Sequence, residues 1–363
     1  MKKNMLAKKL TTALLTGAMV MTMGGMTALA EGPTQPVTND TSITFKKEIQ
    51  KEENVYTPAL EDSKIEFSIT SANVPSNTTD RDGNVVYPGP MDAITNVGQI
   101  AASFADDLND NTSPSIIRNV TIDINKDAFV DSEGKFKPGV YRYMVEEVDP
   151  GYDGLAADTK DYYLDVFVYA DDTQCQSVMY DSADPAKAKK IDTIVNTYAT
   201  SDLTIDKVVS GDQASDTQEF NFTVTIEGAV GEKYYASNGA AETASGEGET
   251  GIATFKFTLS ANDEPITIYG LSASDKYTVV EDDANSDGYK TTYYNGAVDT
   301  GKEMKDGVNG VDMGENDVTI IVQNAKSAVS PTGIAMTFAP YIVMVAFAGV
   351  FAVMFLRKKR EDF

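Results

Sequence analysis

Tyr143-Met144-Val145-Glu146-Glu147 and Tyr277-Thr278-Val279-Val280-Glu281 are two stretches with one pattern, Tyr-x-Val-x-Glu, that recurs far apart in the chain. Aromatic and β-branched residues at alternate positions are typical of a strand, where successive side chains point to opposite faces. In both stretches the Tyr, the first Val and the last Glu therefore share one apolar face. The repeat predicts two β units in tandem, each with an acidic residue on the buried side of a strand.

Each of these stretches lies between a strand that carries a Lys and a strand that carries an Asn. The Lys strands are Ile43-Thr44-Phe45-Lys46-Lys47 and Leu203-Thr204-Ile205-Asp206-Lys207, and the Asn strands are Ile194-Val195-Asn196 and Val318-Thr319-Ile320-Ile321-Val322-Gln323-Asn324. Alternation places Lys47 rather than Lys46, and Glu147 rather than Glu146, on the apolar face. Each half thus buries one Lys, one Glu and one Asn, and unpaired ions there would cost several kcal/mol each.

Further short alternating segments bounded by Gly, Pro, Asn or Asp fill both halves, as in an all-β sandwich protein. The lengths predict two tandem immunoglobulin-like β-sandwich domains, at 42–199 and 200–327, after a flexible leader at 31–41. One helix is expected at 94–108, where apolar residues recur at helical spacing. Residues 237–251, rich in Gly, Ala, Ser and Glu, are expected to form a mobile surface loop.

Both ends of the chain carry signals for export. Residues 1–30 have a basic start, an apolar run and the ending Ala28-Leu29-Ala30, which predict a cleaved signal peptide. Residues 334–356 carry no charge and are long enough as a helix to cross roughly 30 Å of hydrocarbon. The basic tail Arg357-Lys358-Lys359-Arg360 would stay in the cytoplasm, so the rest of the chain is predicted to lie outside the cell.

The composition excludes several functions. The net charge is −25, and removal of both ends lowers Lys plus Arg from 30 to 22 and Asp plus Glu from 55 to 53, a net charge of −31. So acidic a surface repels nucleic acid. The absence of His excludes a Ser-His-Asp triad and an imidazole metal site, and the one cysteine, Cys175, cannot form an internal disulfide. No cofactor, metal or nucleic acid is expected.

The C-terminal region 328–363 resembles the cell-wall sorting signal of Gram-positive surface proteins. Ser330-Pro331-Thr332-Gly333 stands just ahead of the apolar span, and the resemblance implies that a sortase cuts between Thr332 and Gly333. The alternative is an ordinary membrane anchor with a chance Pro-Thr-Gly sequence.

Nearly the whole mature chain resembles Gram-positive backbone pilins of the two-domain streptococcal type. Beside the two Tyr-x-Val-x-Glu strands and the sorting signal, the resemblance is carried by Gly139-Val140-Tyr141, Val208-Val209-Ser210-Gly211 and Glu219-Phe220-Asn221-Phe222. It implies internal isopeptide bonds, Lys47 to Asn196 assisted by Glu147 and Lys207 to Asn324 assisted by Glu281.

Burial favours a neutral amine and a neutral acid, so that the acid would donate to the Asn carboxamide oxygen while the amine attacks. Alternatively both lysines reach solvent and the Glu residues form ordinary ion pairs.

The resemblance also implies a lysine that accepts the Thr332 acyl group of the next subunit. The matching stretch is Asp184-Pro185-Ala186-Lys187-Ala188-Lys189-Lys190-Ile191-Asp192, where Lys189 holds the corresponding position, Lys190 is the next candidate and Lys187 a third. Ordinary solvated lysines are the alternative.

The expected function is structural rather than enzymatic: a major pilin subunit, assembled by sortase into a covalent shaft of identical subunits. The implied partners are tip or base pilins and peptidoglycan, and the implied location is a pilus on the cell wall, with the precursor held in the membrane. The alternative function is a singly anchored adhesin that binds a host or cell-surface ligand.

Overall fold

The computed structural model describes residues 41–169, 175–305 and 307–327, together with 341, 343–345 and 348. All of them belong to one compact unit, Asn39–Phe363. The predicted signal peptide, the leader up to Asp40, most of the predicted span at 334–356, and Thr332 and Gly333 lie outside the described residues. Within the described part of the chain, no helix has the length and apolar character of a membrane span.

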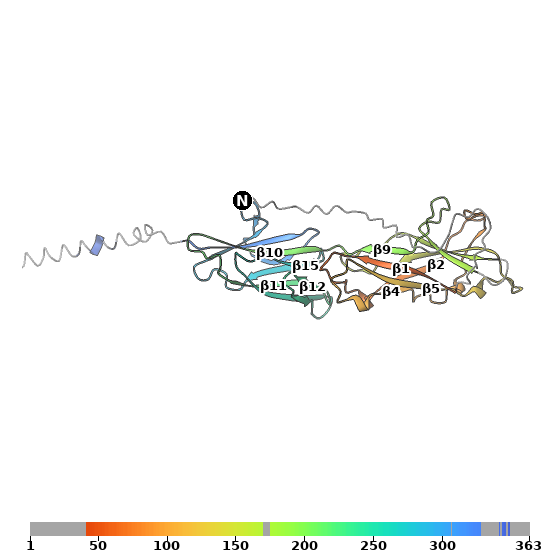
Figure 1. Cartoon of the computed structure of the whole chain (residues 1–363), viewed down its shortest axis with the longest axis horizontal. Coiled ribbons are helices and arrows are strands. Elements are labelled where there is room, and N and C mark those ends of the chain that lie inside the picture. Colours follow the sequence, from red (N-terminus) through yellow and green to blue (C-terminus); the bar gives the residue numbers. More distant parts are fainter. Residues whose placement is uncertain are drawn as a thin grey trace, which may run out of the picture. The chain divides into compact units, whose positions relative to one another are not determined.

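The first half folds as two β-sheets around one hydrophobic core (Figure 1). The smaller sheet has the order β5-β1-β9 and the larger the order β4-β2-β6-β7-β8, with β3 paired to β6. The strands are β1 Ser42–Gln50, β2 Lys64–Ser71, β3 Val86–Pro88, β4 Ala101–Ser103, β5 Ser115–Asp123, β6 Gly139–Glu147, β7 Tyr162–Val168, β8 Cys175–Tyr180 and β9 Thr193–Thr197. Four short 3-10 turns lie between them: η1 Glu61–Ser63, η2 Met91–Ala93, η3 Ala105–Asp107 and η4 Lys126–Phe129.

The second half repeats this plan with its own core. One sheet has the order β13-β12-β15-β10-β20-β17-β18 and the other the order β14-β11-β16-β19. The strands are β10 Ser201–Ser210, β11 Phe220–Ala229, β12 Lys233–Ala236, β13 Ala241–Thr243, β14 Thr250–Leu259, β15 Ile266–Leu271, β16 Lys276–Glu281, β17 Lys290–Asn295, β18 Lys302–Glu303, β19 Val308–Asp312 and β20 Val318–Ala325. The predicted all-β fold with two tandem sandwiches is confirmed.

In each half the first and last strands are parallel neighbours. β1 pairs with β9 and β10 pairs with β20, and each pairing brings the two ends of the half into one sheet. Figure 1 shows β9 beside β1. Alternation of side chains then turns one face of these strands into the core: Phe45 and Ile49 of β1 and Leu203 and Ile205 of β10 are buried. In each of these parallel pairs, the side chains that face inward from the two strands therefore enter the same core.

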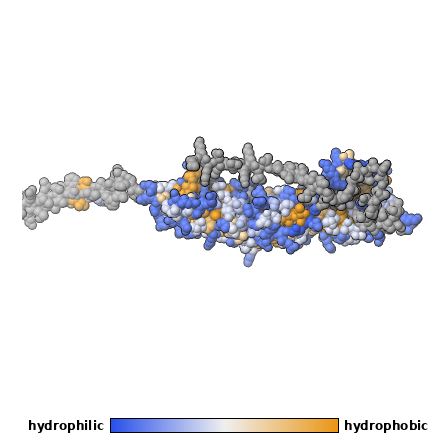
Figure 2. Space-filling model, in the orientation of Figure 1, coloured by the Kyte–Doolittle hydropathy of each residue, from blue (hydrophilic) through white to orange (hydrophobic). Residues whose placement is uncertain are grey.

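The face of the molecule that Figure 2 shows is mostly polar. On the face that Figure 2 shows, hydrophilic residues cover most of the described surface and apolar ones form small separate patches. This agrees with the strongly acidic composition of the chain.

Two local expectations from the sequence are wrong. Residues 94–108 form no α-helix: the chain turns at Gly98, whose φ is +78°, and continues through β4 and η3. Ile94, Ile100 and Phe104 are nevertheless buried. Residues 237–251 are not simply a loop, because Ala241–Thr243 pairs with β12 and Ser245 forms a bridge with Ile252.

Candidate functional site

The structure brings the predicted Lys, Glu and Asn together in both halves. Lys47 of β1 is in register with Ile194 of β9, and Asn196 lies two residues further along the same face. Lys207 of β10 is likewise in register with Val322 of β20, two residues before Asn324. The acid comes from the facing sheet, Glu147 at the end of β6 and Glu281 at the end of β16. The same geometry thus arises twice from the same topology.

In the first site the three side chains bond to one another. Lys47 Nζ donates to Glu147 Oε2 at 2.6 Å and to Asn196 Oδ1 at 2.5 Å. Asn196 Nδ2 donates to Glu147 Oε1. The side chains of Lys47 and Glu147 are both 0% exposed, whereas Lys46 and Glu146 are only partly buried. This lysine does not reach solvent.

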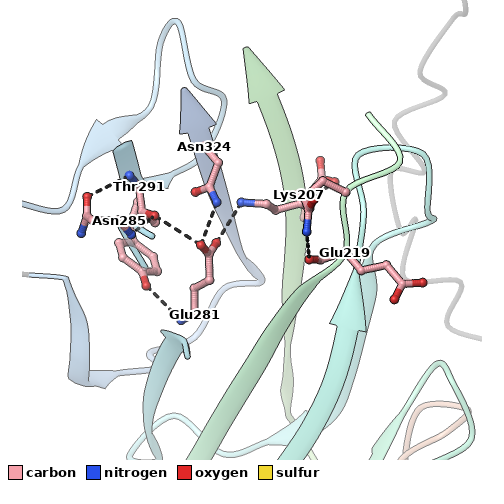
Figure 3. Close-up of polar contacts among 9 residues, drawn as sticks. Lys207, Glu219, Glu281, Asn285, Thr291 and Asn324 are labelled. Atoms are coloured by element: carbon pink, nitrogen blue, oxygen red, sulfur yellow. Dashed lines mark hydrogen bonds and ion pairs between the residues drawn. The ribbon is translucent and has the colours of Figure 1, made fainter. Parts of the chain in front are cut away.

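In the second site a Glu likewise lies between a Lys and an Asn, as Figure 3 shows for Glu281, Lys207 and Asn324. Glu281 Oε2 accepts from Lys207 Nζ at 2.9 Å, and Glu281 Oε1 accepts from Asn324 Nδ2 at 2.7 Å and from Thr291 Oγ1 at 3.3 Å. Asn324 Oδ1 is buried and accepts no hydrogen bond from a described group. Lys207 Nζ also lies 4.0 Å from the ring centre of Phe220.

Burial lowers the pKa of the lysine in both sites. Burial lowers the pKa of Lys47, although its hydrogen bond and attraction to Glu147 oppose the shift. Burial lowers the pKa of Lys207 in the same way against Glu281. A lowered pKa increases the fraction of unprotonated amine, which is the nucleophilic form. Each site therefore holds a potential nucleophile and an amide carbon, with a Glu carboxyl group in contact with both side chains.

In both sites the acid faces the amide nitrogen of the Asn rather than its oxygen. The sequence had led us to expect that the acid donates to the carboxamide oxygen. The observed contact places the acid beside the group that would leave as ammonia. Thr291 is a further partner of Glu281 that the sequence pattern did not indicate, since no motif links it to the triad.

The candidate acceptor lysines lie outside these sites. Lys187, Lys189 and Lys190 are all exposed, in the segment that joins β8 to β9. Lys187 forms an ion pair with Asp184 at 3.3 Å. No ion pair links Lys189 or Lys190 to another described residue.

A second group of buried acids, which the sequence pattern does not indicate, lies around Tyr234. Glu232 and Asp275 are 3% and 2% exposed and share one hydroxyl: Tyr234 Oη lies 2.9 Å from Glu232 Oε2 and 3.1 Å from Asp275 Oδ2. Glu232 Oε1 also accepts from Tyr198 at 3.1 Å and Ser272 at 3.2 Å. The members of this group lie in three separate segments, at 198, 232–234 and 272–275, so no single sequence motif could reveal it.

Each of the two tandem sandwiches of this chain holds a buried Lys-Glu-Asn triad between its first and last strands. The fold of the chain is similar to that of solved major pilins of Streptococcus pyogenes. The major pilin T3.2 of Streptococcus pyogenes is 23% identical, with a TM-score of 0.54 over 80% of this chain and 99% of that one. Another S. pyogenes major pilin structure is 21% identical, with a TM-score of 0.52 over 80% of this chain and all of the other.

Comparison by sequence points the same way. A pilin of S. pyogenes serotype M1 is 28% identical over 372 residues, which cover 97% of this chain and 99% of that protein. Residues 201–316 match a family model described as a domain of unknown function, DUF7601. The resemblance to streptococcal backbone pilins that the sequence predicted is therefore confirmed.

Proposed function

We propose that this chain is the major subunit of a covalent pilus shaft, and that two internal isopeptide bonds tie the first strand of each sandwich to its last. The observation that carries the proposal is the duplicated triad: Lys and Asn on parallel neighbouring strands, with Glu between them from the facing sheet. Burial of an ion pair does not stabilise a fold reliably, so two such pairs in equivalent places call for another role.

The bond would form within each site and without a cofactor. The neutral Lys amine attacks the Asn side-chain carbonyl carbon, and the Glu carboxyl group gives a proton to the Asn nitrogen. The carbon–nitrogen bond of the carboxamide then breaks, ammonia leaves, and the Glu regains a proton from the new amide nitrogen. The acid is unchanged at the end, so Glu147 and Glu281 act once each on their own chain.

Polymerisation would join subunits through the C-terminal signal. Sortase breaks the Thr332–Gly333 peptide bond, releases the Gly333 amine and holds the Thr332 acyl group. The amine of Lys189 or Lys190 of another subunit then attacks that carbonyl carbon, forms an amide and gives up one proton as sortase leaves. The exposure of both lysines supports this assignment. The cell wall and tip or base pilins would be the further partners, and the polymer would lie outside the cell.

Intact mass of the folded chain tests the internal bonds. Each bond removes one ammonia, so we expect a mass two ammonia units below that of the sequence after signal removal. Glu281→Gln keeps the size of the side chain but removes the carboxyl group, and should leave only one unit missing. Glu219→Gln, at an exposed neighbouring position, is the matched control and should keep both bonds.

A wild-type mass equal to that calculated from the sequence would contradict the proposed bonds.

The shaft itself is tested by the wall fraction of cells, in which a ladder of denaturant-resistant oligomers is expected. A single wall-released band would favour the adhesin instead.

A further inference from the structure

The lysines of the proposed polymer joint lie in an ordered loop, residues 181–190, which we call the acceptor loop. Its two ends are held together: Asp181 N donates to Lys189 O at 3.1 Å, and Lys189 N donates to Asp181 Oδ1 at 2.7 Å. Tyr180, the last residue of β8, and Lys190 form an antiparallel bridge at the base of the loop. Lys189 and Lys190 are thus fixed by their backbone while their side chains are exposed.

Asp184 organises the tip of the acceptor loop. Its carbonyl oxygen accepts from Lys187 N at 2.9 Å and from Ala188 N at 2.8 Å, and its Oδ1 accepts from Ala186 N at 2.9 Å. The hydrogen bond from Ala186 N and the contact with Lys187 lower the pKa of Asp184, which keeps it charged. Because the Lys187 ammonium is paired with this carboxylate, Lys189 and Lys190 are the better placed amines.

A buried arginine connects the loop to the sheet beneath it. Arg142 of β6 and Asp165 of β7 are in register, with Arg142 Nε and Nη2 each 2.7 Å from a carboxylate oxygen of Asp165. The two residues are 6% and 2% exposed. The remaining guanidinium nitrogen, Nη1, donates to Ala183 O of the acceptor loop at 2.9 Å.

The planar guanidinium spreads its donors over three nitrogens, so it can hold both Asp165 oxygens and Ala183 O at once, whereas the compact ammonium group of Lys cannot span these separate acceptors. If the loop moved away, the donor would lose its partner in a buried place, which carries a penalty. The ion pair therefore resists displacement of the loop as well as linking two strands.

We propose that Arg142, supported by Asp165, is a positioning residue for polymerisation, which holds the acceptor loop so that Lys189 and Lys190 are presented to the acyl-bearing sortase. The inference rests on the proposed function, namely polymerisation at one of these two lysines. An ordered loop loses less conformational entropy in the encounter than a free one does. Arg142 touches no reacting atom.

Arg142→Lys is the decisive variant, since Lys preserves the charge opposite Asp165 but cannot reach both partners as a fork. In cells that assemble the full-length chain, we expect the ratio of polymer to monomer to fall roughly tenfold, the equivalent of one charge-assisted hydrogen bond. The monomer should still lack two ammonia units, which reports intact sandwiches. Arg81→Lys, at an exposed position of the same half, is the matched control.

A purely electrostatic role for Arg142 would be fulfilled by Lys, so a normal ladder from Arg142→Lys would overturn the inference. If that variant fails to fold, the double variant Arg142→Met with Asp165→Leu removes the pair without leaving a buried charge. It should fold and polymerise poorly, and normal polymerisation would overturn the inference. Replacement of both Lys189 and Lys190 by Ala separates the two hypotheses, because an unchanged ladder there contradicts the proposed acceptor itself.

Discussion

The hydroxyl of Tyr234 has one proton but lies between two buried carboxyl groups, those of Glu232 and Asp275. It can donate to only one of them at a time, and a proton on the other carboxyl group would complete the second contact by donating to the Tyr oxygen. Burial, together with the charge of Glu232, raises the pKa of Asp275 to about 8, and burial raises the pKa of Glu232 as well. Tyr198, Tyr152 and Asp153 face the same group, and none of these can supply a positive charge.

This shared proton gives the second half a pH-dependent stability. An acid whose pKa is raised by folding binds its proton more tightly in the folded state, so stability is lost as the pH rises from its ordinary pKa of 3.8 to about 8. We expect the melting temperature of the second half to fall across that range, and Asp275→Asn to flatten the fall. Calorimetry at several pH values measures both.

Asp283→Asn, at an exposed turn, is the control and should keep the wild-type slope. Equal slopes for wild type and Asp275→Asn would show that the carboxyl pair shares no proton.

At the scale of elements, β11 shows how closely this group is packed. Gly228 lies near the end of β11, and a Cβ atom there would lie 2.0 Å from Tyr234 Oη and 2.8 Å from both Asp275 Oδ1 and Glu232 Oε2. We expect Gly228→Ala to lower the free energy of unfolding of the second half by about 1–3 kcal/mol, the usual result of overpacking. Chemical denaturation gives the value.

The adjacent exposed residue offers a comparison. Ala229→Ser should change that free energy by less than about 0.5 kcal/mol. A Gly228→Ala protein as stable as Ala229→Ser would mean that the hydroxyl and the carboxyls can move apart without cost.

Strand alternation predicted much of the fold and both triads, because a period of two leaves only one face for each residue. Lys47, Glu147 and Asn196 lie where this rule places them, and so do Lys207, Glu281 and Asn324. The rule fails where the chain is irregular. Ile94, Ile100 and Phe104 have helical spacing, yet each enters the core from a different short segment, since the turn at Gly98 interrupts the path.

Contacts between distant segments were beyond prediction. Strand alternation puts Arg142 on the face opposite Tyr143 and Asp165 on the face opposite Leu164, yet both are buried, and Arg142 donates to Ala183 O of the acceptor loop. The pairing of Tyr198 with Glu232 likewise depends on how the segments after β9 and before β12 meet.

At the scale of the whole molecule, the proposed bonds determine how a stretched pilus would respond. Tension would enter at Lys189 or Lys190, follow β9 and the start of β10 to Lys207, cross to Asn324 and leave at Thr332. The chain between Lys207 and Asn324 would therefore carry no tension. In single-molecule stretching of the polymer, wild-type subunits should therefore show no unfolding step, whereas Glu281→Gln should release roughly 400 Å per subunit at about 3.4 Å per residue.

Glu147→Gln is the informative comparison. Its missing bond lies off this route, so no step of similar length is expected. Long steps from Glu147→Gln and none from Glu281→Gln would contradict the proposed points of attachment.

The parallel pairing of β9 with β1 has a mechanical meaning. β9 is already extended and is followed directly by the next half. The remaining strands of the first sandwich are therefore attached to the force-bearing segment but carry no tension themselves. They would keep their shape while the fibre is under strain. The exposed surface of these strands would then be the same in a pilus under tension as in a relaxed pilus.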